Sequence, residues 1–426
     1  MPFPKPLWTA LSLLALAPAF AQAPPSPSVP DLNSAGVLGS QIFQESSSTG
    51  MVLVVVRDHH VFFQGYGETA PNSHQLPNQQ SLIRLCSLTK IFTTDVLAKL
   101  VADKTVRLND PLQIYAPPNI AVPQLGKPIT LLNLATHTSG LPREIGTGPR
   151  HSPHFTYPDF STRWNWLPTQ TPISVPGTSA VYSNVGFDFL SDALQAAAHE
   201  QYAALLAQRT LNPLHMYSTT YFPNADQCSR LLITNHNEGP CSVTEATAGS
   251  SGLYSTPADM AIWLQYLLAD GTPGGTQVIP LQDPAAQAIY LLPSDLVSQY
   301  GLSHAGKPSA IGLGWMHLLG PDTPSHIVEK TGGGAGFTTY IAINHAHRTA
   351  VFVAATEGSG DSHINLFDAA NNLLLAMSGL PPLPMPAPRI HAVRRHRATQ
   401  APRHQATPAP HRRSAPAARR HRASRN

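Results

Sequence analysis

A serine and a lysine three residues apart, Ser87 and Lys90, have the residue types and the spacing that nucleophilic catalysis needs. Residues three apart share one face of a helix, so the Lys90 amine would lie one turn from the Ser87 hydroxyl and could take its proton. The chain has seven lysines, and only Lys90 follows a serine at this spacing. The alternative is a helix N-cap followed by a solvated lysine, so the pair needs support from elsewhere in the chain.

Two further groups of residues supply that support. Tyr182 and Asn184 lie two apart in a segment suited to a turn, where a phenol and an amide can project to the same side. Lys330 and Thr331 end a predicted strand and precede glycines at 332–334, which allow another backbone to come close. A cation, a hydroxyl and an exposed strand edge can together hold a peptide with a terminal carboxylate. Taken singly, Tyr182 could be a core residue and Lys330 a solvated strand end.

The elements that position these side chains follow from the hydrophobic pattern. Apolar residues recur at helical spacing from 88 to 101, which predicts a helix from near Ser87 to about Asp103. Unpaired N–H groups at its start would favour an oxyanion at the Ser87 acyl centre. Strands are predicted at 51–56, 61–67, 327–331, 337–344 and 350–356, and a closing helix at 367–377. The predicted fold class is α/β, an antiparallel sheet built from both chain ends and flanked by N- and C-terminal helices, with a mostly helical insertion at about 105–310.

The three groups of residues, in this order, resemble the motifs of the serine β-lactamase and penicillin-binding protein superfamily. The middle group has the Tyr-x-Asn form of class C enzymes and D,D-peptidases, and the Ser-Asp-Asn form of class A enzymes is absent. The resemblance covers roughly residues 35–380, which would form one serine hydrolase domain. The chain departs from the superfamily at Cys86 and in its basic C-terminal tail.

The resemblance implies acyl-enzyme chemistry. Ser87 would attack a D-Ala-D-Ala amide carbonyl, while Lys90, Tyr182 or both would take its proton and pass it to the leaving amine. The backbone N–H groups of Ser87 and Gly333 would form the oxyanion hole. No cofactor and no metal are implied.

The resemblance also implies how a substrate is held. Lys330 would keep the site cationic and, with Thr331, hold the substrate carboxylate, while Asn184 would orient the acyl side chain. The expected partners are peptidoglycan muropeptides and, as covalent ligands, β-lactams. A class C-like β-lactamase or an esterase remains open as the alternative, because fold and nucleophile do not determine the substrate.

The N-terminus has the composition of an export signal. Lys5 precedes an apolar run at 7–20 that ends in the small-residue pattern Ala19-Phe20-Ala21. This predicts a signal peptide at 1–21, a Pro/Ser-rich linker at 22–34 and a periplasmic protein. An uncleaved membrane anchor is the alternative.

The net charge of +3 conceals an asymmetry. Residues 389–426 hold eleven Arg, five His and no acidic residue, which leaves 16 Lys and Arg against 24 Asp and Glu, a formal charge of −8. Residues 381–426 are therefore expected to be a disordered basic tail rich in Pro, Ala, Arg and His. Such a tail could bind an anionic envelope polymer, which is the non-enzymatic alternative, or simply be solvated. Nucleic acid is not an expected partner, because the signal directs the protein out of the cytoplasm.

Three cysteines suit an exported enzyme. Cys228 and Cys241 lie thirteen apart in a polar stretch and could form a disulfide, leaving Cys86 as a small buried residue beside the nucleophile. Three unpaired thiols are the alternative. His151 and His154 lack a further ligand at helix spacing, so no metal site is predicted.

Overall fold

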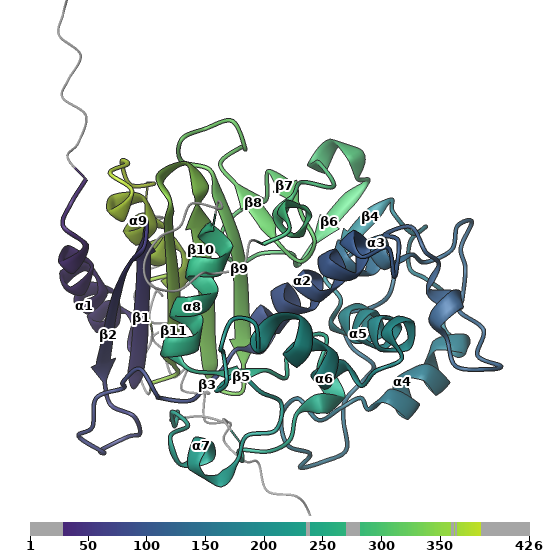
Figure 1. Ribbon diagram of the computed structural model, residues 1–426, viewed down its shortest axis with the longest axis horizontal. Helices are drawn as coiled ribbons and strands as arrows, with labels where there is room; N and C mark the ends of the chain where they lie inside the picture. The colour runs from purple at the N-terminus through teal and green to yellow at the C-terminus, as the bar shows by residue number, and fades with distance from the viewer. Residues whose placement is uncertain (1–28, 236–238, 270–281, 359–361, 363, 385–426) are drawn as a thin grey trace, which may run out of the picture. The chain divides into compact units, whose positions relative to one another are not determined.

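The computed structural model describes residues 29–235, 239–269, 282–358, 362 and 364–384. The predicted signal peptide, the start of the linker and residues 385–426 of the basic tail lie outside the described residues. The fold is α/β, as the hydrophobic pattern predicts, and its centre is a seven-stranded sheet in the order β2-β1-β11-β10-β9-β8-β7 (Figure 1). Its strands are β1 (Gly50–Arg57), β2 (His60–Gly67), β7 (Ala310–Ile311), β8 (Met316–Leu318), β9 (Ile327–Gly334), β10 (Phe337–Asn344) and β11 (Thr349–Thr356).

The sheet joins the two ends of the chain. Strand β1 pairs antiparallel with both β2 and β11, and β11 continues through β10 to β9. Alternate residues of β1 pack into opposite hydrophobic clusters, with Val52 and Val54 on one face and Leu53 and Val55 on the other. Because both faces are buried, β1 is an almost continuous run of apolar, mostly β-branched residues.

Helices cover both faces of the sheet (Figure 1). On one face lie α1 (Ala35–Ser46) and α9 (Leu366–Met377), and on the other lies α8 (Pro257–Leu268). The expected linker ends earlier than residue 34, because Leu32–Ser34 form a 3-10 helix in which Asp31 caps the N-terminus and which leads directly into α1.

The region between β2 and β7 contains α2 (Thr89–Ala102), α8, further helices and two small sheets. Strand β3 (Ile83–Arg84) pairs antiparallel with β5 (Tyr254–Ser255), and β4 (Ser179–Val181) pairs parallel with β6 (Ser298–Tyr300). The other α-helices of this region are α3 (Leu131–Ala135), α4 (Phe160–Trp166), α5 (Asn184–Ala198), α6 (Tyr202–Leu206) and α7 (Ala225–Ser229). Further 3-10 helices cover Cys86–Leu88, Leu112–Tyr115, Leu167–Thr169, Glu245–Thr247, Pro284–Gln287, Pro293–Asp295 and His345–His347, and a π-helix covers Ala207–Leu211.

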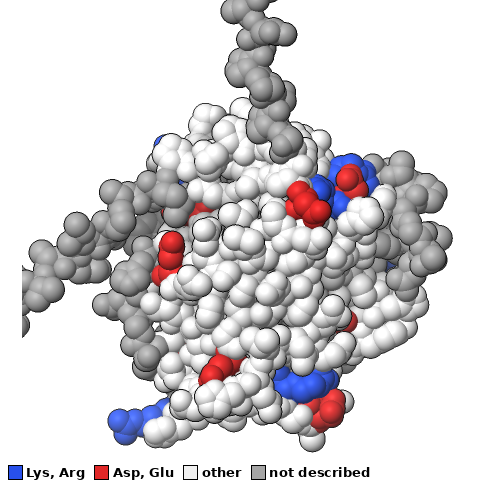
Figure 2. All heavy atoms as spheres, turned by 90° about the vertical axis from the view of Figure 1, so that its left-hand side faces the viewer, with Lys and Arg blue, Asp and Glu red and all other residues white. Residues whose placement is uncertain are grey.

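Charged side chains are sparse on the face formed by the α1 and β2 side of the molecule. Figure 2 shows lysines, arginines and acidic residues there singly or in small mixed groups among uncharged residues. The described part of this face therefore carries no broad patch of one sign of the kind that attracts a polyanion. Within the described residues, none of the helices combines the length and the apolar composition needed to cross a bilayer.

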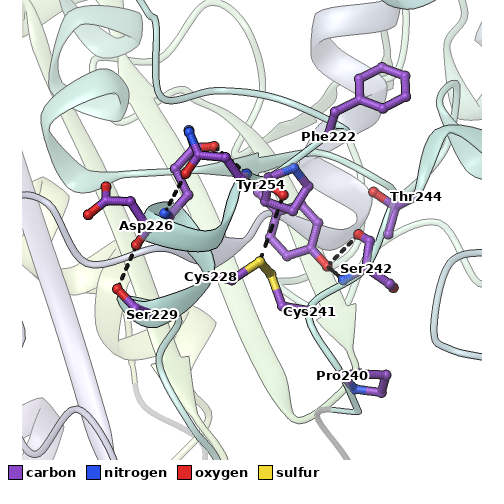
Figure 3. Close-up of a disulfide and its surroundings, with 12 residues drawn as sticks. Phe222, Asp226, Cys228, Ser229, Pro240, Cys241, Ser242, Thr244 and Tyr254 are labelled. Carbon is purple, nitrogen blue, oxygen red and sulfur yellow. Dashed lines mark hydrogen bonds between the residues drawn. A yellow bond between two sulfur atoms is a disulfide. The ribbon is translucent and has the colours of Figure 1, made fainter.

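A disulfide joins Cys228 in α7 to Cys241 (Figure 3). The segment beside Cys241 supports the strand that leads to Ser87: the Arg84 guanidinium donates to the Pro240 carbonyl at 2.8 Å and to the Tyr254 hydroxyl at 2.7 Å. Arg84 is 1% exposed, so these acceptors replace the water that its charge would otherwise bind. The disulfide therefore holds in place a loop on which a buried arginine depends.

Replacing Cys228 and Cys241 together with serine is expected to lower the free energy of unfolding by about 3 kcal/mol, because the link closes a short loop and restricts the unfolded chain. Denaturant titration of the oxidised protein against the double variant measures this loss. The wild-type protein in excess reductant is the matched control and should unfold with the variant. A reductant-treated protein as stable as the oxidised one would contradict the prediction.

Candidate active site

Ser87 lies in a tight turn that the surrounding sheet and strands hold in place. It is the middle residue of the 3-10 helix Cys86–Leu88, and the regular helix α2 begins at Thr89, two residues later than the pattern predicted. Cys86 adopts a positive φ of 52°, a conformation that is strained for a side chain of this kind. The Thr89 hydroxyl donates to the Cys86 carbonyl at 2.7 Å, and the Thr339 hydroxyl donates to the Leu85 carbonyl at 2.9 Å.

Strand β9 passes directly beside this turn. A Cβ atom at Gly332 would lie 2.2 Å from the Thr339 hydroxyl and 3.2 Å from the Ser87 backbone nitrogen. A side chain there would push the strand away from the nucleophile, which gives a physical reason for glycine at this position. Gly333 lines the same cavity as Ser87, so the two residues predicted for the oxyanion hole meet at one place.

Lys90 approaches Ser87 from inside the protein. Its side chain is fully buried, and its Nζ lies 3.4 Å from Ser87 Oγ. The same nitrogen donates to Asn184 Oδ1 at 2.6 Å and to the Ser250 carbonyl at 2.8 Å. In its neutral form the amine has two protons, which these two oxygens can accept, and its lone pair would then be available to take the Ser87 proton.

Burial makes the neutral form of Lys90 accessible. Loss of solvation, together with the nearby Arg143, lowers the pKa of Lys90 to about 7, although Asp188 and Glu144 oppose the change. A lysine with this pKa is partly neutral at physiological pH and can act as a general base. The structure thus gives Lys90 both the position and the protonation state that proton transfer from Ser87 needs.

Tyr182 is held among a histidine ring and three cations. The His137 ring stacks on it with ring centroids 4.4 Å apart. Lys90 Nζ and Lys330 Nζ lie 4.9 Å and 5.2 Å from the Tyr182 ring centroid, and the Arg143 guanidinium carbon lies at 4.8 Å. Attraction between the ring and the charged forms of these three side chains helps to hold the phenol beside both amines.

Lys330 and Thr331 lie on the part of β9 that faces the cavity. Strand β8 pairs only with residues 327–329, so the described strands leave one edge of β9 unpaired from Lys330 onward. Burial and the neighbouring Lys90 lower the pKa of Lys330, while Tyr182 and Glu329 raise it. An open strand edge next to a buried cation is suited to an extended peptide with a carboxylate.

These segments enclose one cavity of about 270 Å³. The residues that line it are Ser87, Arg143, Tyr182, Gly301, Leu302, His304, Thr331, Gly332, Gly333, Thr338 and Phe367. Lys90 and Lys330 are buried behind these residues, and their amines lie close to Ser87 and to the Tyr182 ring, respectively. The sequence groups around residues 87, 182 and 330 therefore converge on one site.

Asn184 contacts the amine of Lys90 rather than the cavity. Besides accepting from Lys90, its amide donates to Glu144. Its expected role in orienting an acyl group stays a prediction, and in the structure it positions Lys90.

Several supporting residues were not identified from the sequence as part of the site. Asp188, one turn after Asn184 in α5, is buried, and burial raises its pKa to about 7. His137, expected to be structural, accepts from the Ser183 N–H through Nδ1 at 3.1 Å, and burial lowers its pKa well below the usual range. Spacing within α5 could have pointed to Asp188, but no local pattern distinguishes His137.

The remaining cysteine, Cys86, has the properties of a structural residue rather than a reactive one. Burial raises the pKa of Cys86 to about 12, and its thiol donates to the Gly334 carbonyl, so it stays protonated. Among the described residues, no group of three or more His, Cys, Asp or Glu side chains is arranged to hold a metal ion.

A nucleophile, a buried lysine and a strand edge converging in this fold define a serine hydrolase of the β-lactamase type. The family model described as Beta-lactamase matches residues 40–375, and the chain belongs to that family. It is similar to the D-alanyl-D-alanine-carboxypeptidase/endopeptidase AmpH of Escherichia coli K12, with 41% identity over 348 residues, which cover 81% of this chain and 89% of AmpH.

Two other relatives agree with this assignment. A solved structure described as a beta-lactamase/D-alanine carboxypeptidase from Yersinia pestis complexed with citrate has a TM-score of 0.76 and 40% identity, and the match covers 82% of this chain and 99% of that one. A protein described as a beta-lactamase from Escherichia coli K12 is 25% identical over 324 residues, which cover 71% of this chain and 82% of the relative.

Proposed function

We propose that this protein is a periplasmic, penicillin-binding serine D,D-carboxypeptidase and endopeptidase that acts on peptidoglycan stem peptides through an acyl-enzyme. The observation that carries the proposal is the position of the buried Lys90 amine. It lies 3.4 Å from Ser87 Oγ and also donates hydrogen bonds to Asn184 and to the Ser250 carbonyl. Two of the three relatives described above, AmpH and the Yersinia pestis protein, have a carboxypeptidase activity in their names, which supports the substrate class. The N-terminal signal pattern at 1–21 supports the location.

The first step forms the acyl-enzyme. Lys90, with or without Tyr182, takes the Ser87 proton as Oγ bonds to the amide carbonyl carbon. The carbonyl oxygen becomes an oxyanion, for which the Ser87 and Gly333 N–H groups would be the donors. The amide C–N bond then breaks and the leaving amine receives the proton. In the second step a water molecule attacks the ester, and Ser87 recovers its proton.

The substrate would lie along β9. Its acyl peptide would pair with the unpaired edge after Lys330, and its terminal carboxylate would bind Lys330 and Thr331. This arrangement brings the scissile carbonyl to the cavity where Ser87 and Gly333 meet.

Purified muropeptides test the proposal directly. Incubation of the protein with a stem pentapeptide should release D-alanine and leave a tetrapeptide, both detected by mass spectrometry. A protein that releases no D-alanine and is not acylated by penicillin would refute the proposed function.

The β-lactamase alternative predicts a different rate of deacylation. We expect a penicillin adduct on Ser87 to persist, because a peptidase turns over this ester slowly, so nitrocefin hydrolysis should stop after about one equivalent or continue at a low kcat. The measurement is the colour change of nitrocefin at known enzyme concentration. Sustained hydrolysis at a high kcat would favour the β-lactamase instead.

None of the residues assigned to this chemistry lies in the basic tail. Its binding to an anionic envelope polymer stays a prediction from charge, because residues 385–426 lie outside the described residues. Sedimentation with purified sacculi at rising salt, with and without residues 385–426, tests it.

A further inference from the structure

We propose that a second cavity beside the catalytic one, formed by residues 293–308, binds the leaving-group peptide when the substrate is a cross-linked pair of stems. This inference rests on the proposed function and extends it to the half of the substrate that departs. A carboxypeptidase releases a single amino acid, whereas an endopeptidase that cuts a cross-link must accommodate a second peptide.

The two cavities are neighbours. Gly301 and Leu302 line both of them. The second cavity has a volume of about 480 Å³, against about 270 Å³ for the catalytic cavity. The catalytic cavity alone is at the lower limit of sites that enclose a small ligand, so a larger substrate must extend beyond it.

The second cavity lies next to the residue that would protonate the leaving amine. The Tyr182 backbone N–H donates to the Tyr300 carbonyl at 3.1 Å, which ties β4 to β6 beside the phenol. Gly301 is close enough that a Cβ atom on it would lie 3.6 Å from Tyr182 Cβ. Because Tyr182 or Lys90 would return the proton to the departing nitrogen, a cavity beside Tyr182 lies close to the group that leaves.

The lining of the second cavity suits a peptide. In the described structure β6 is paired only with β4, so its other edge offers backbone groups to an extended chain. Tyr300 on this strand and Val297, which directly precedes the strand, are 77% and 86% exposed, the highest values among the large hydrophobic residues described. Exposed apolar side chains next to an active site commonly mark a contact surface.

The charge of the lining favours a ligand with carboxylates. Lys307 contributes a cation, and none of the described residues that line this cavity is acidic. A stem peptide that departs from a cross-link carries free carboxylates, so it matches both the apolar and the cationic parts of the surface.

The chemical step is the one already described for the catalytic site. Ser87 Oγ bonds to the carbonyl carbon of the cross-linking amide, and its C–N bond breaks. The second peptide leaves as a free amine with the proton that Ser87 gave up, and water later hydrolyses the ester. The second cavity adds no bond-making group and acts only by binding.

The test compares two substrates with the same acyl donor, a stem pentapeptide and a cross-linked dimer, in the full-length protein. We expect the double variant Tyr300→Ala with Lys307→Gln to lower the ratio of kcat/KM for the dimer over that for the pentapeptide at least tenfold. The matched control is Tyr217→Ala, an aromatic residue that is 69% exposed and lines neither cavity. The control should leave the ratio at its wild-type value.

Three outcomes would overturn the inference. An unchanged ratio in the double variant, or an equal fall for both substrates, would show that the second cavity does not select the leaving group. Wild-type protein that cleaves the pentapeptide but not the dimer would refute the inference and leave the proposed function standing. Wild-type protein that cleaves neither and is not acylated by penicillin would refute both.

Discussion

Replacing Ser87 with alanine is expected to abolish covalent labelling by a fluorescent penicillin and to lower kcat for D-alanine release by a factor on the order of 10⁶. The reason is chemical rather than structural, because the acyl-enzyme requires an oxygen at this position. Ser87 is 9% exposed at the cavity wall, so loss of the hydroxyl removes little packing. Gel fluorescence and peptide mass mapping of the labelled wild-type protein measure both the loss and the position of the adduct.

The neighbouring thiol provides the control for this prediction. Cys86→Ala should still be labelled, because the Cys86 thiol is buried and stays protonated with a pKa of about 12. Labelling that survives in Ser87→Ala, or that maps to a peptide without residue 87, would overturn the assignment of the nucleophile.

The rate of acylation is expected to rise with pH through about 7, because Lys90 must lose a proton before it can accept one from Ser87. Burial lowers the pKa of Lys90 to about 7, so below that pH the ammonium form predominates and the reaction slows. Lys90→Met should lower the acylation rate by about 10³-fold to 10⁴-fold and remove this rise. Stopped-flow acylation by a chromogenic cephalosporin from pH 5 to 9 measures the profile.

Two further variants assign the pH dependence to Lys90. The Asp188 carboxylate raises the pKa of Lys90, so Asp188→Asn should move the midpoint of the profile to lower pH. Tyr182→Phe should slow acylation and keep the midpoint if Lys90 is the base. A profile that loses its midpoint in Tyr182→Phe and keeps it in Lys90→Met would make Tyr182 the base instead.

The hydrophobic pattern of the sequence was sufficient to predict the strands of the central sheet. Runs such as 51–56 and 350–355 are apolar throughout because both faces of the central sheet are covered, and that pattern predicts buried strands from local sequence. The predicted start of α2 was two residues too early, because a 3-10 turn around Ser87 precedes the regular helix. That turn and the positive φ of Cys86 depend on contacts with Thr339 and β9. Contacts of that kind leave no local signature.

The sequence likewise predicted some properties of the candidate site, and only the tertiary structure showed the others. Residue type and spacing were enough to single out Ser87, Lys90 and the groups around residues 182 and 330, because nucleophile, base and carboxylate-binding chemistry require particular side chains at particular intervals. Only the tertiary structure decided the pKa of Lys90, since burial lowers it and Asp188 and Glu144, both distant from Lys90 in the sequence, oppose that change. The second cavity at 293–308 was likewise invisible in the sequence, because it exists only where β6 meets Tyr182. Side-chain identity is a local property, whereas solvation and the shape of a cavity belong to the whole fold.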